Sequence, residues 1–332
     1  MPWFDLSLDR LREYRTETVE PSELDEWWQR RLGEARAQAR APDITRYEAD
    51  IYRPVEVYDV EFSGAGGDRI KAWYLQPAGA DGLTPVVVKF IGYGGGRGLP
   101  TEHTLLPAVG YSVFVMDTRG QGGRWTSGAT GDRQPAGTPG GPENAQVMTR
   151  GIGRPEDYYY TRLFTDAVRA VETASELAGA PRVAVSGISQ GGGLALATAA
   201  LAPRAVAVCH ADVPFLCDIQ RAITLAPDPP YTEVPEFLAH NVDEIPAALD
   251  TLRYVDCALL ARRITARCLL SVGLMDTICP PSTVFAAYNE IIAGKEISVH
   301  PFTGHAVPAA HAERQLRHFR DFLLGAGPAL PG

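Results

Sequence analysis

The chain has 332 residues, with 31 Lys and Arg against 40 Asp and Glu, and a formal net charge of −9. Apolar residues make up 45% and charged residues 21%, a balance that excludes intrinsic disorder, a fibrous repeat and a coiled coil. The acidic balance argues against a nucleic-acid binder, which needs a basic face. The sequence contains no run of about 18 apolar residues, so it predicts no membrane-spanning helix. The length allows two domains, but we expect a single α/β domain over residues 1–332.

The N-terminal sequence and the cysteines indicate the cellular setting. The N-terminal sequence lacks the basic start and apolar stretch of a secretion signal, so we expect a cytoplasmic protein. The cysteine count is odd and no CxxC pair occurs, which predicts buried single thiols rather than disulfides or a metal site. The five cysteines are Cys209, Cys217, Cys257, Cys268 and Cys279.

Residues 1–50 are predicted to form an N-terminal helical extension. Its clearest helix follows Pro21, and Ser22 has the residue type of an N-cap. Trp27 and Trp28 are adjacent large apolar side chains on an otherwise charged helix. They either fix this helix to the domain or form a contact between subunits.

From residue 55 onward the pattern changes to short β-rich runs. The first two runs alternate around glycines and predict a hairpin, and most later runs are continuously apolar, as strands buried on both faces require. Helical patterns at 156–179, 194–202 and 280–294 lie between them. This order predicts one mostly parallel sheet of about eight strands with helices on both faces. The predicted strands are 55–62, 69–75, 85–91, 111–117, 182–186, 205–210, 267–273 and 296–302.

Two long segments interrupt the alternation. Residues 120–153 are rich in Gly, Pro, Thr and Ser and too long for a simple connection, which predicts a functional or interface excursion. Residues 215–256 follow the sixth predicted strand and contain five prolines between short helical pieces. An insertion at this point would arch over the C-terminal strand ends, so we predict a lid or pocket wall.

The segment 187–191, Gly-Ile-Ser-Gln-Gly, lies between a predicted strand and a predicted helix. This G-x-S-x-G setting predicts a nucleophile elbow with Ser189 on a strained turn, where a side chain at either glycine would collide with its neighbours. The alternative is a turn of a nucleotide-binding fold, but neither GxGxxG nor GxxxxGK[ST] follows any strand.

A nucleophilic serine needs a base and an orienting acid, which in this fold class follow it in the order acid, then His. Asp276 follows the seventh predicted strand and His305 follows the eighth, which predicts the triad Ser189, Asp276 and His305. Asp212 and Asp117, each at a strand end, are the alternative acids.

Other histidines receive structural interpretations. His311 and His318 lie in the last helical stretch and are expected to face solvent, and His210 is expected to be a core residue. The oxyanion donors are predicted to be the backbone N–H group of Gln190 and one from the glycine-rich loop 92–98, in which Tyr93 is the one large residue.

Arg119 is predicted to be an ion-pair residue that fixes the long loop, and the role of Gln121 is open. For the pocket around the acyl group, Pro230 and Tyr231 of the predicted lid are the candidate wall residues.

At this point the sequence resembles the carbohydrate esterase family of acetyl xylan esterases and cephalosporin C deacetylases. The resemblance extends over about residues 4–323. It is carried by GYGGGRG from Gly92, DTRGQGG from Asp117, MTRGI from Met148, GISQGGGLALA from Gly187 and GLMDTICPPSTVFAAYN from Gly273.

The resemblance implies an α/β-hydrolase that removes acetyl groups from xylo-oligosaccharides and cephalosporin C without a metal or organic cofactor. It implies the same triad, with the backbone N–H groups of Tyr93 and Gln190 as the oxyanion donors. It also implies a homohexamer, a trimer of dimers, in which 120–153 is the interface loop. In one departure, Ala306 follows His305 where the family usually has Glu. The alternatives are a broader carboxylesterase or peptidase of the same fold, or a scaffold without activity.

Overall fold

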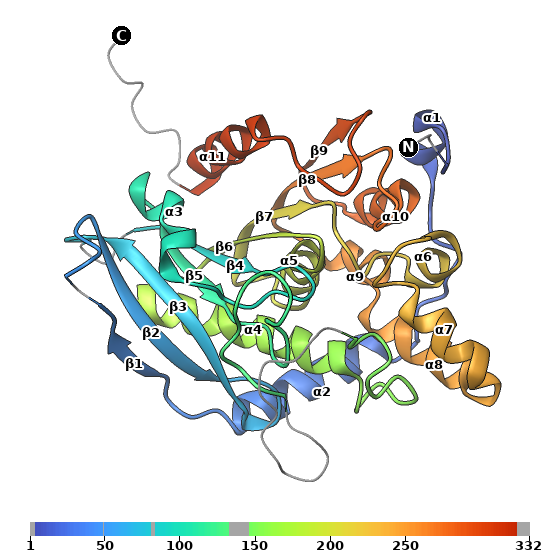
Figure 1. Ribbon diagram of the computed structural model, residues 1–332, viewed down its shortest axis with the longest axis horizontal. Helices are drawn as coiled ribbons and strands as arrows, with labels where there is room; N and C mark the ends of the chain where they lie inside the picture. The colour runs from blue at the N-terminus through green and yellow to red at the C-terminus, as the bar shows by residue number, and fades with distance from the viewer. Residues whose placement is uncertain (1–3, 49, 81–83, 133–145, 324–332) are drawn as a thin grey trace.

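The computed structural model describes residues 4–48, 50–80, 84–132 and 146–323. In this part of the chain, one sheet has the strand order β1-β2-β3-β5-β4-β6-β7-β8-β9 (Figure 1). The pairs β1–β2, β2–β3 and β3–β5 are antiparallel, and all others are parallel. The predicted α/β class with a mostly parallel sheet is therefore confirmed.

All eight predicted strands are present, with ends shifted by at most a few residues. The ninth, β1, escaped prediction because its four exposed residues show no apolar alternation. The strands are β1 Asp43–Arg46, β2 Val55–Ser63, β3 Arg69–Pro77, β4 Val86–Phe90, β5 Ser112–Met116, β6 Val183–Ile188, β7 Val206–Asp212, β8 Arg267–Gly273 and β9 Lys295–His300.

Helices cover the two faces of the sheet unequally. One face, called here the α4/α5 face, carries the large continuous core of the domain. The opposite face, called the α3/α11 face, has two much smaller apolar clusters. The helices of the first face include α4 Tyr159–Ala178, α5 Gln190–Leu201, α9 Cys257–Leu260 and α10 Pro281–Glu290, and those of the second are α3 Leu105–Ala108 and α11 Ala310–Leu323.

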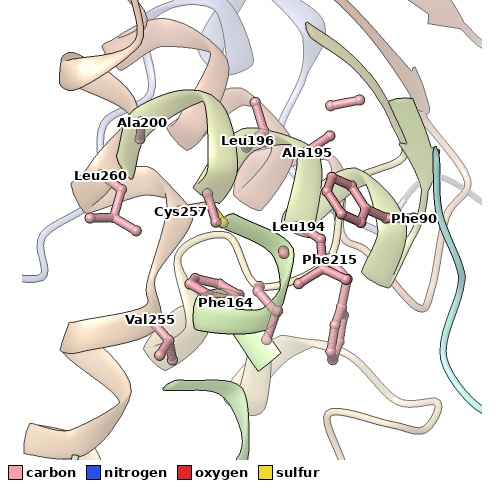
Figure 2. Close-up of a cluster of buried hydrophobic side chains, with 14 of the residues drawn as sticks. Phe90, Phe164, Leu194, Ala195, Leu196, Ala200, Phe215, Val255, Cys257 and Leu260 are labelled. Carbon is pink, nitrogen blue, oxygen red and sulfur yellow. The ribbon is translucent and has the colours of Figure 1, made fainter. Parts of the chain in front are cut away.

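The central helix α5 is buried on all sides. Every residue from Gln190 to Ala200 is buried, which explains why all the residues after Gln190 are apolar or small. Figure 2 shows Leu194 and Leu196 of this helix among aromatic and aliphatic side chains from several elements. Cys257 Sγ lies 3.3 Å from Gly193 O, so a neighbouring helix packs closely against the glycines of α5.

The N-terminal extension contains α1 Leu8–Glu13 and α2 Leu24–Ala37. Both tryptophans of α2 are buried within the chain, where Trp28 Nε1 donates to Tyr254 O at 2.9 Å and Trp27 Nε1 donates to Glu156 Oε1 at 3.1 Å. Of the two interpretations, fixing the helix to the domain is confirmed. The predicted cap is wrong, because the helix begins one residue later, after Glu23, and Ser22 Oγ donates to the Glu23 carboxylate instead.

The predicted lid segment folds into short helices at the C-terminal ends of the strands. They are α6 Ile219–Leu225, α7 Glu233–His240 and α8 Ile245–Leu252. The described part of the chain also contains short 3-10 helices, at Ala65–Gly67, Pro100–His103, Val242–Glu244, Arg253–Val255 and Ala261–Arg263. Of the excursion 120–153, residues 133–145 lie outside the described residues.

All five cysteines are buried and free, which confirms the predicted single thiols. Among the helices of the described ranges, none is both long and apolar enough to cross a bilayer.

Candidate active site

Ser189 lies in the turn between β6 and α5, at the C-terminal edge of the sheet. Its backbone has φ 58° and ψ −119°, a strained conformation for a residue with a side chain. The surrounding backbone holds it there, because Ser189 N–H donates to Asp212 O at 2.9 Å and Ser189 O accepts from the N–H groups of Gly193 and Phe215 at 3.0 Å. This is the sharp strand–turn–helix geometry that the sequence predicts for a nucleophile.

Both flanking glycines are required by close contacts. A Cβ atom on Gly187 would lie 2.3 Å from the carbonyl carbon of Gly191, and one on Gly191 would lie 2.3 Å from Phe90 O. Backbone atoms cannot move aside as a flexible side chain could. The predicted collision at these two positions is therefore confirmed.

Two loops that follow neighbouring strands bring His305 and Asp276 together. His305 Nδ1 lies 2.8 Å from Asp276 Oδ2. The carboxylate is fully buried, and its other oxygen accepts from the backbone N–H groups of Ile278 and Cys279 at 2.9 Å each. Because the acid holds Nδ1 as the donor, Nε2 of the neutral imidazole is left as the proton acceptor.

Ser189 and His305 line one pocket of about 340 Å³. Pro230 lines it too, with Pro229 and Ile278. The other candidate wall residue, Tyr231, is absent from this lining and fully buried, with its hydroxyl accepting from Leu216 N–H at 2.9 Å. Its ring packs 4.1 Å from that of Phe215, which does not line the pocket either.

The alternative acids are engaged elsewhere. Asp212 accepts from Ser271 Oγ at 2.7 Å and Gln315 Nε2 at 2.8 Å, and it lies 2.9 Å from His311 Nε2. Asp117 accepts from two backbone N–H groups. Asp276 is the carboxylate that contacts His305.

The expectation that His311 and His318 face solvent is wrong. Both are buried, since α11 turns this side toward the sheet. His318 Nδ1 lies 3.0 Å from Nε2 of the buried His210, whose ring stacks on Phe319 at 3.9 Å. His210 is a core residue, as predicted.

The glycine-rich loop after β4 places Tyr93 in the wall of the same pocket. Gln190, which follows Ser189, is the first residue of α5, so its N–H has no acceptor within the helix. The buried Gln121 links the two segments: its Oε1 accepts from Gly94 N–H at 2.7 Å, and its Nε2 donates to Gln190 Oε1 at 2.9 Å. This contact answers the question that the sequence left open about Gln121.

Sequence reasoning missed Glu233, the first residue of α7. Its Oε1 accepts from the Tyr93 hydroxyl at 2.6 Å, and its Oε2 accepts from Met148 N–H at 3.2 Å. Val147 N–H donates to the same hydroxyl at 3.1 Å. Burial raises the pKa of the Glu233 carboxyl. Glu233 therefore ties the glycine-rich loop to the lid segment and to the end of the 120–153 excursion, and no local sequence pattern signals it.

Arg119 is fully buried among carboxylates. Its guanidinium lies 2.8 Å from Asp166 Oδ1, 3.1 Å from Asp68 and 3.3 Å from Asp132. Burial alone would lower its pKa, but these carboxylates raise it above the ordinary value. Since Asp132 belongs to the long excursion, the predicted ion-pair role is confirmed.

Asp276, Cys279 and His305 each offer a potential metal ligand within 4.8 Å of the others. The described hydrogen bonds commit the Asp276 carboxylate to His305 and to two backbone N–H groups. Burial raises the pKa of the Cys279 thiol well above its ordinary value, which opposes the thiolate that a metal would need. The group therefore fits an oriented base better than a metal site.

The family model described as acetyl xylan esterase (AXE1) matches residues 1–322. The chain belongs to this family. The acetyl xylan esterase family is a family of carboxylic ester hydrolases, and the α/β-hydrolase fold implied by the resemblance is confirmed.

Known relatives agree with this membership. The acetyl xylan esterase from Paenibacillus sp. R4 is 32% identical with a TM-score of 0.85, over 96% of this chain and 100% of that one. Acetyl xylan esterase 1 from Thermoanaerobacterium sp. JW/SL YS485 is 34% identical with a TM-score of 0.81, over 95% and 98%. The acetyl esterase Axe7A of Xylanibacter ruminicola is 28% identical over 298 residues, which is 87% of this chain but 64% of that protein's length.

Proposed function

We propose that this member of the acetyl xylan esterase family is a serine esterase that removes acetyl groups from acetylated xylo-oligosaccharides and related small acetyl esters, including cephalosporin C. The observation that carries the proposal is the joint placement of Ser189, on its strained turn, and the Asp276–His305 pair at one pocket. The relatives described above are an acetyl esterase and two acetyl xylan esterases, which supports an acetyl ester as the substrate class.

In the proposed first half-reaction, Ser189 Oγ attacks the acetyl carbonyl carbon while His305 Nε2 takes the hydroxyl proton. Asp276 orients the imidazole and stabilises its charged form. The negative oxygen of the tetrahedral intermediate accepts hydrogen bonds from the N–H groups of Tyr93 and Gln190. His305 then returns the proton to the leaving alcohol oxygen, and the acetyl group remains on Ser189.

In the second half-reaction water gives a proton to His305 and attacks the acetyl-enzyme. The collapse of this second intermediate releases acetate and restores the serine hydroxyl. The apolar walls formed by Pro229, Pro230 and Ile278 suit the methyl of an acetyl group. A broader carboxylesterase would accept butyryl and longer esters at similar rates, whereas the proposed acetylesterase loses activity steeply with acyl length.

The test is the Ser189→Ala variant, assayed for acetate release from acetylated xylo-oligosaccharides, cephalosporin C and 4-nitrophenyl acetate. We expect a loss of at least ~10⁴-fold in kcat, because nucleophile removal leaves only binding and oxyanion stabilisation. An unchanged thermal unfolding transition controls for folding. Undiminished turnover, or a wild-type protein that a fluorophosphonate probe does not label at Ser189, would contradict the proposal.

We also propose that the chain assembles as a homohexamer, a trimer of dimers. The support is the family membership and the excursion 120–153, whose described ends pack on the domain through Arg119 and Glu233. The mass of the particle in solution, measured by light scattering, tests this; a monomer would contradict it.

A further inference from the structure

A second hollow lies beside the pocket that contains Ser189. Its volume is about 460 Å³, larger than the 340 Å³ of the first pocket. Gly92, Trp125 and Ile188 line both hollows. The two hollows therefore adjoin, and a part of a substrate that extends from the first pocket over these residues enters the second hollow.

The fold explains why the sheet is hollowed here. On the α3/α11 face, α3 is a single turn of four residues, and α11 lies over β7 and β8 (Figure 1). The C-terminal ends of β4 and β6 line the hollow between these helices. The apolar part of the lining comes from α3, β5, α11 and the residue directly after β4, and includes Ile91, Leu105, Leu106, Val113, Leu316 and Phe319.

The boundary between the two hollows is apolar and exposed. The side chains of Trp125 and Ile188 are 59% and 51% exposed, and Ile188 is the residue next to Ser189. Trp125 is held in place, because its Nε1 donates to Tyr93 O at 2.9 Å and its ring packs against Gly95 so closely that a Cβ atom there would lie 2.4 Å from it. A fixed, exposed indole beside a nucleophile offers a flat surface for a ring.

The polar groups of the second hollow are largely paired with one another. His103 Nε2 donates to Arg97 O at 2.8 Å, which leaves Nδ1 to accept from Lys89 Nζ at 3.3 Å. Gln315 Nε2 donates to the Asp212 carboxylate at 2.8 Å. The walls therefore present mainly carbon to a ligand, which suits an apolar ring.

We propose that this second hollow is an additional subsite for the alcohol part of the ester, and that it extends the substrates beyond acetylated sugars to acetyl esters of apolar ring alcohols, aromatic or alicyclic. The inference rests on the proposed function, in which Ser189 takes the acetyl group. The acyl carbon must lie at Ser189, so the alcohol oxygen lies in the first pocket and its ring crosses Trp125 and Ile188. Burial of the ring against the apolar walls then lowers the barrier for large ring alcohols relative to small ones.

The test compares 2-naphthyl acetate with phenyl acetate, whose leaving alcohols are similarly acidic but differ in apolar area. We expect kcat/KM to be about tenfold higher for the naphthyl ester. In Ala312→Trp, an exposed position of α11 that lines only the second hollow, the naphthyl-to-phenyl ratio falls by about tenfold because the indole fills the space. The matched control Ala310→Trp, exposed on the same helix but outside the lining, leaves the ratio unchanged.

A second measurement needs no variant. We expect 2-naphthol to inhibit phenyl acetate hydrolysis more strongly than phenol does. An unchanged ratio in a folded Ala312→Trp protein, or inhibition by 2-naphthol no stronger than that by phenol, would overturn the subsite. Ser189→Ala separates the two proposals: if it still cleaves both esters the proposed function fails, and if it is inactive while the ratio is insensitive to Ala312→Trp only the subsite fails.

Discussion

The two faces of the sheet differ in how completely they are covered. The α4/α5 face carries long helices and one continuous core, which extends to both tryptophans of α2. The α3/α11 face carries a one-turn helix, a terminal helix and two small clusters, with the second hollow between them. We infer that the α4/α5 face supplies most of the folding stability. The α3/α11 face is less tightly packed and leaves a surface that a ligand can reach.

The largest expected effect compares one phenylalanine from each face. Phe164 is fully buried on α4 and stacks near Trp28 at 6.0 Å, whereas Phe319 on α11 borders the second hollow. We expect Phe164→Ala to lower the free energy of unfolding by about 5 kcal/mol and Phe319→Ala by about 3 kcal/mol, because a side chain beside an existing hollow loses fewer contacts. Urea unfolding of both variants measures the difference. Equal losses would contradict the unequal contribution of the faces.

A smaller effect concerns how the α4/α5 side holds the active site. Glu233 of α7 fixes the Tyr93 hydroxyl, and α7 packs into the large core through Val234 and Leu238. We expect Glu233→Gln to lower kcat about tenfold with little change in KM, since a displaced Tyr93 N–H would stabilise the transition state less than before.

The matched control for this prediction is Glu236→Gln, an exposed acid on the same helix, which should leave kcat unchanged. Tyr93→Phe, which keeps the backbone N–H but removes the hydroxyl, should reproduce the loss and not add to it in the double variant. A change in KM alone would show that Glu233 shapes substrate binding rather than the oxyanion site.

The smallest expected effect is a difference in pH response between the faces. The histidines with lowered pKa values belong to the α3/α11 side of the described chain. Burial lowers the pKa of His210 well below its ordinary value, and it also lowers the pKa values of His300 and His318. The pKa of His103 is lowered to about 4, mainly by burial and in second place by the positive charge of Lys89.

A base with a lowered folded pKa binds its proton more weakly in the folded state than in the unfolded state. Its contribution to stability is therefore complete above the unfolded pKa, near 6.5, and is lost as the pH falls from there toward the folded value. We expect amide hydrogen exchange in α11, corrected for intrinsic rates, to accelerate severalfold between pH 7 and pH 5 while α4 changes little. An equal acceleration in both helices would show that acid loosens the whole domain.

Much of the fold was predictable because its signals are local. Continuous apolar runs predicted the buried strands, whereas β1 was missed because its exposed residues carry no such pattern. The prediction of an N-cap at Ser22 was wrong although the local signal was present. Ser22 has a suitable residue type, but it lies one position before the actual N-cap, Glu23, and only the backbone geometry decides between the two.

By itself, the sequence determined the elbow at Ser189 and the chain order of the acid and the base, since both depend on short segments at strand ends. Only the tertiary structure decided which acid meets His305, that His311 and His318 are buried, and that Glu233 reaches Tyr93 across 140 positions of the chain. The second hollow also emerged only there. It depends on how far apart α3 and α11 lie on one face of the sheet, and no neighbouring residues in the chain encode that separation.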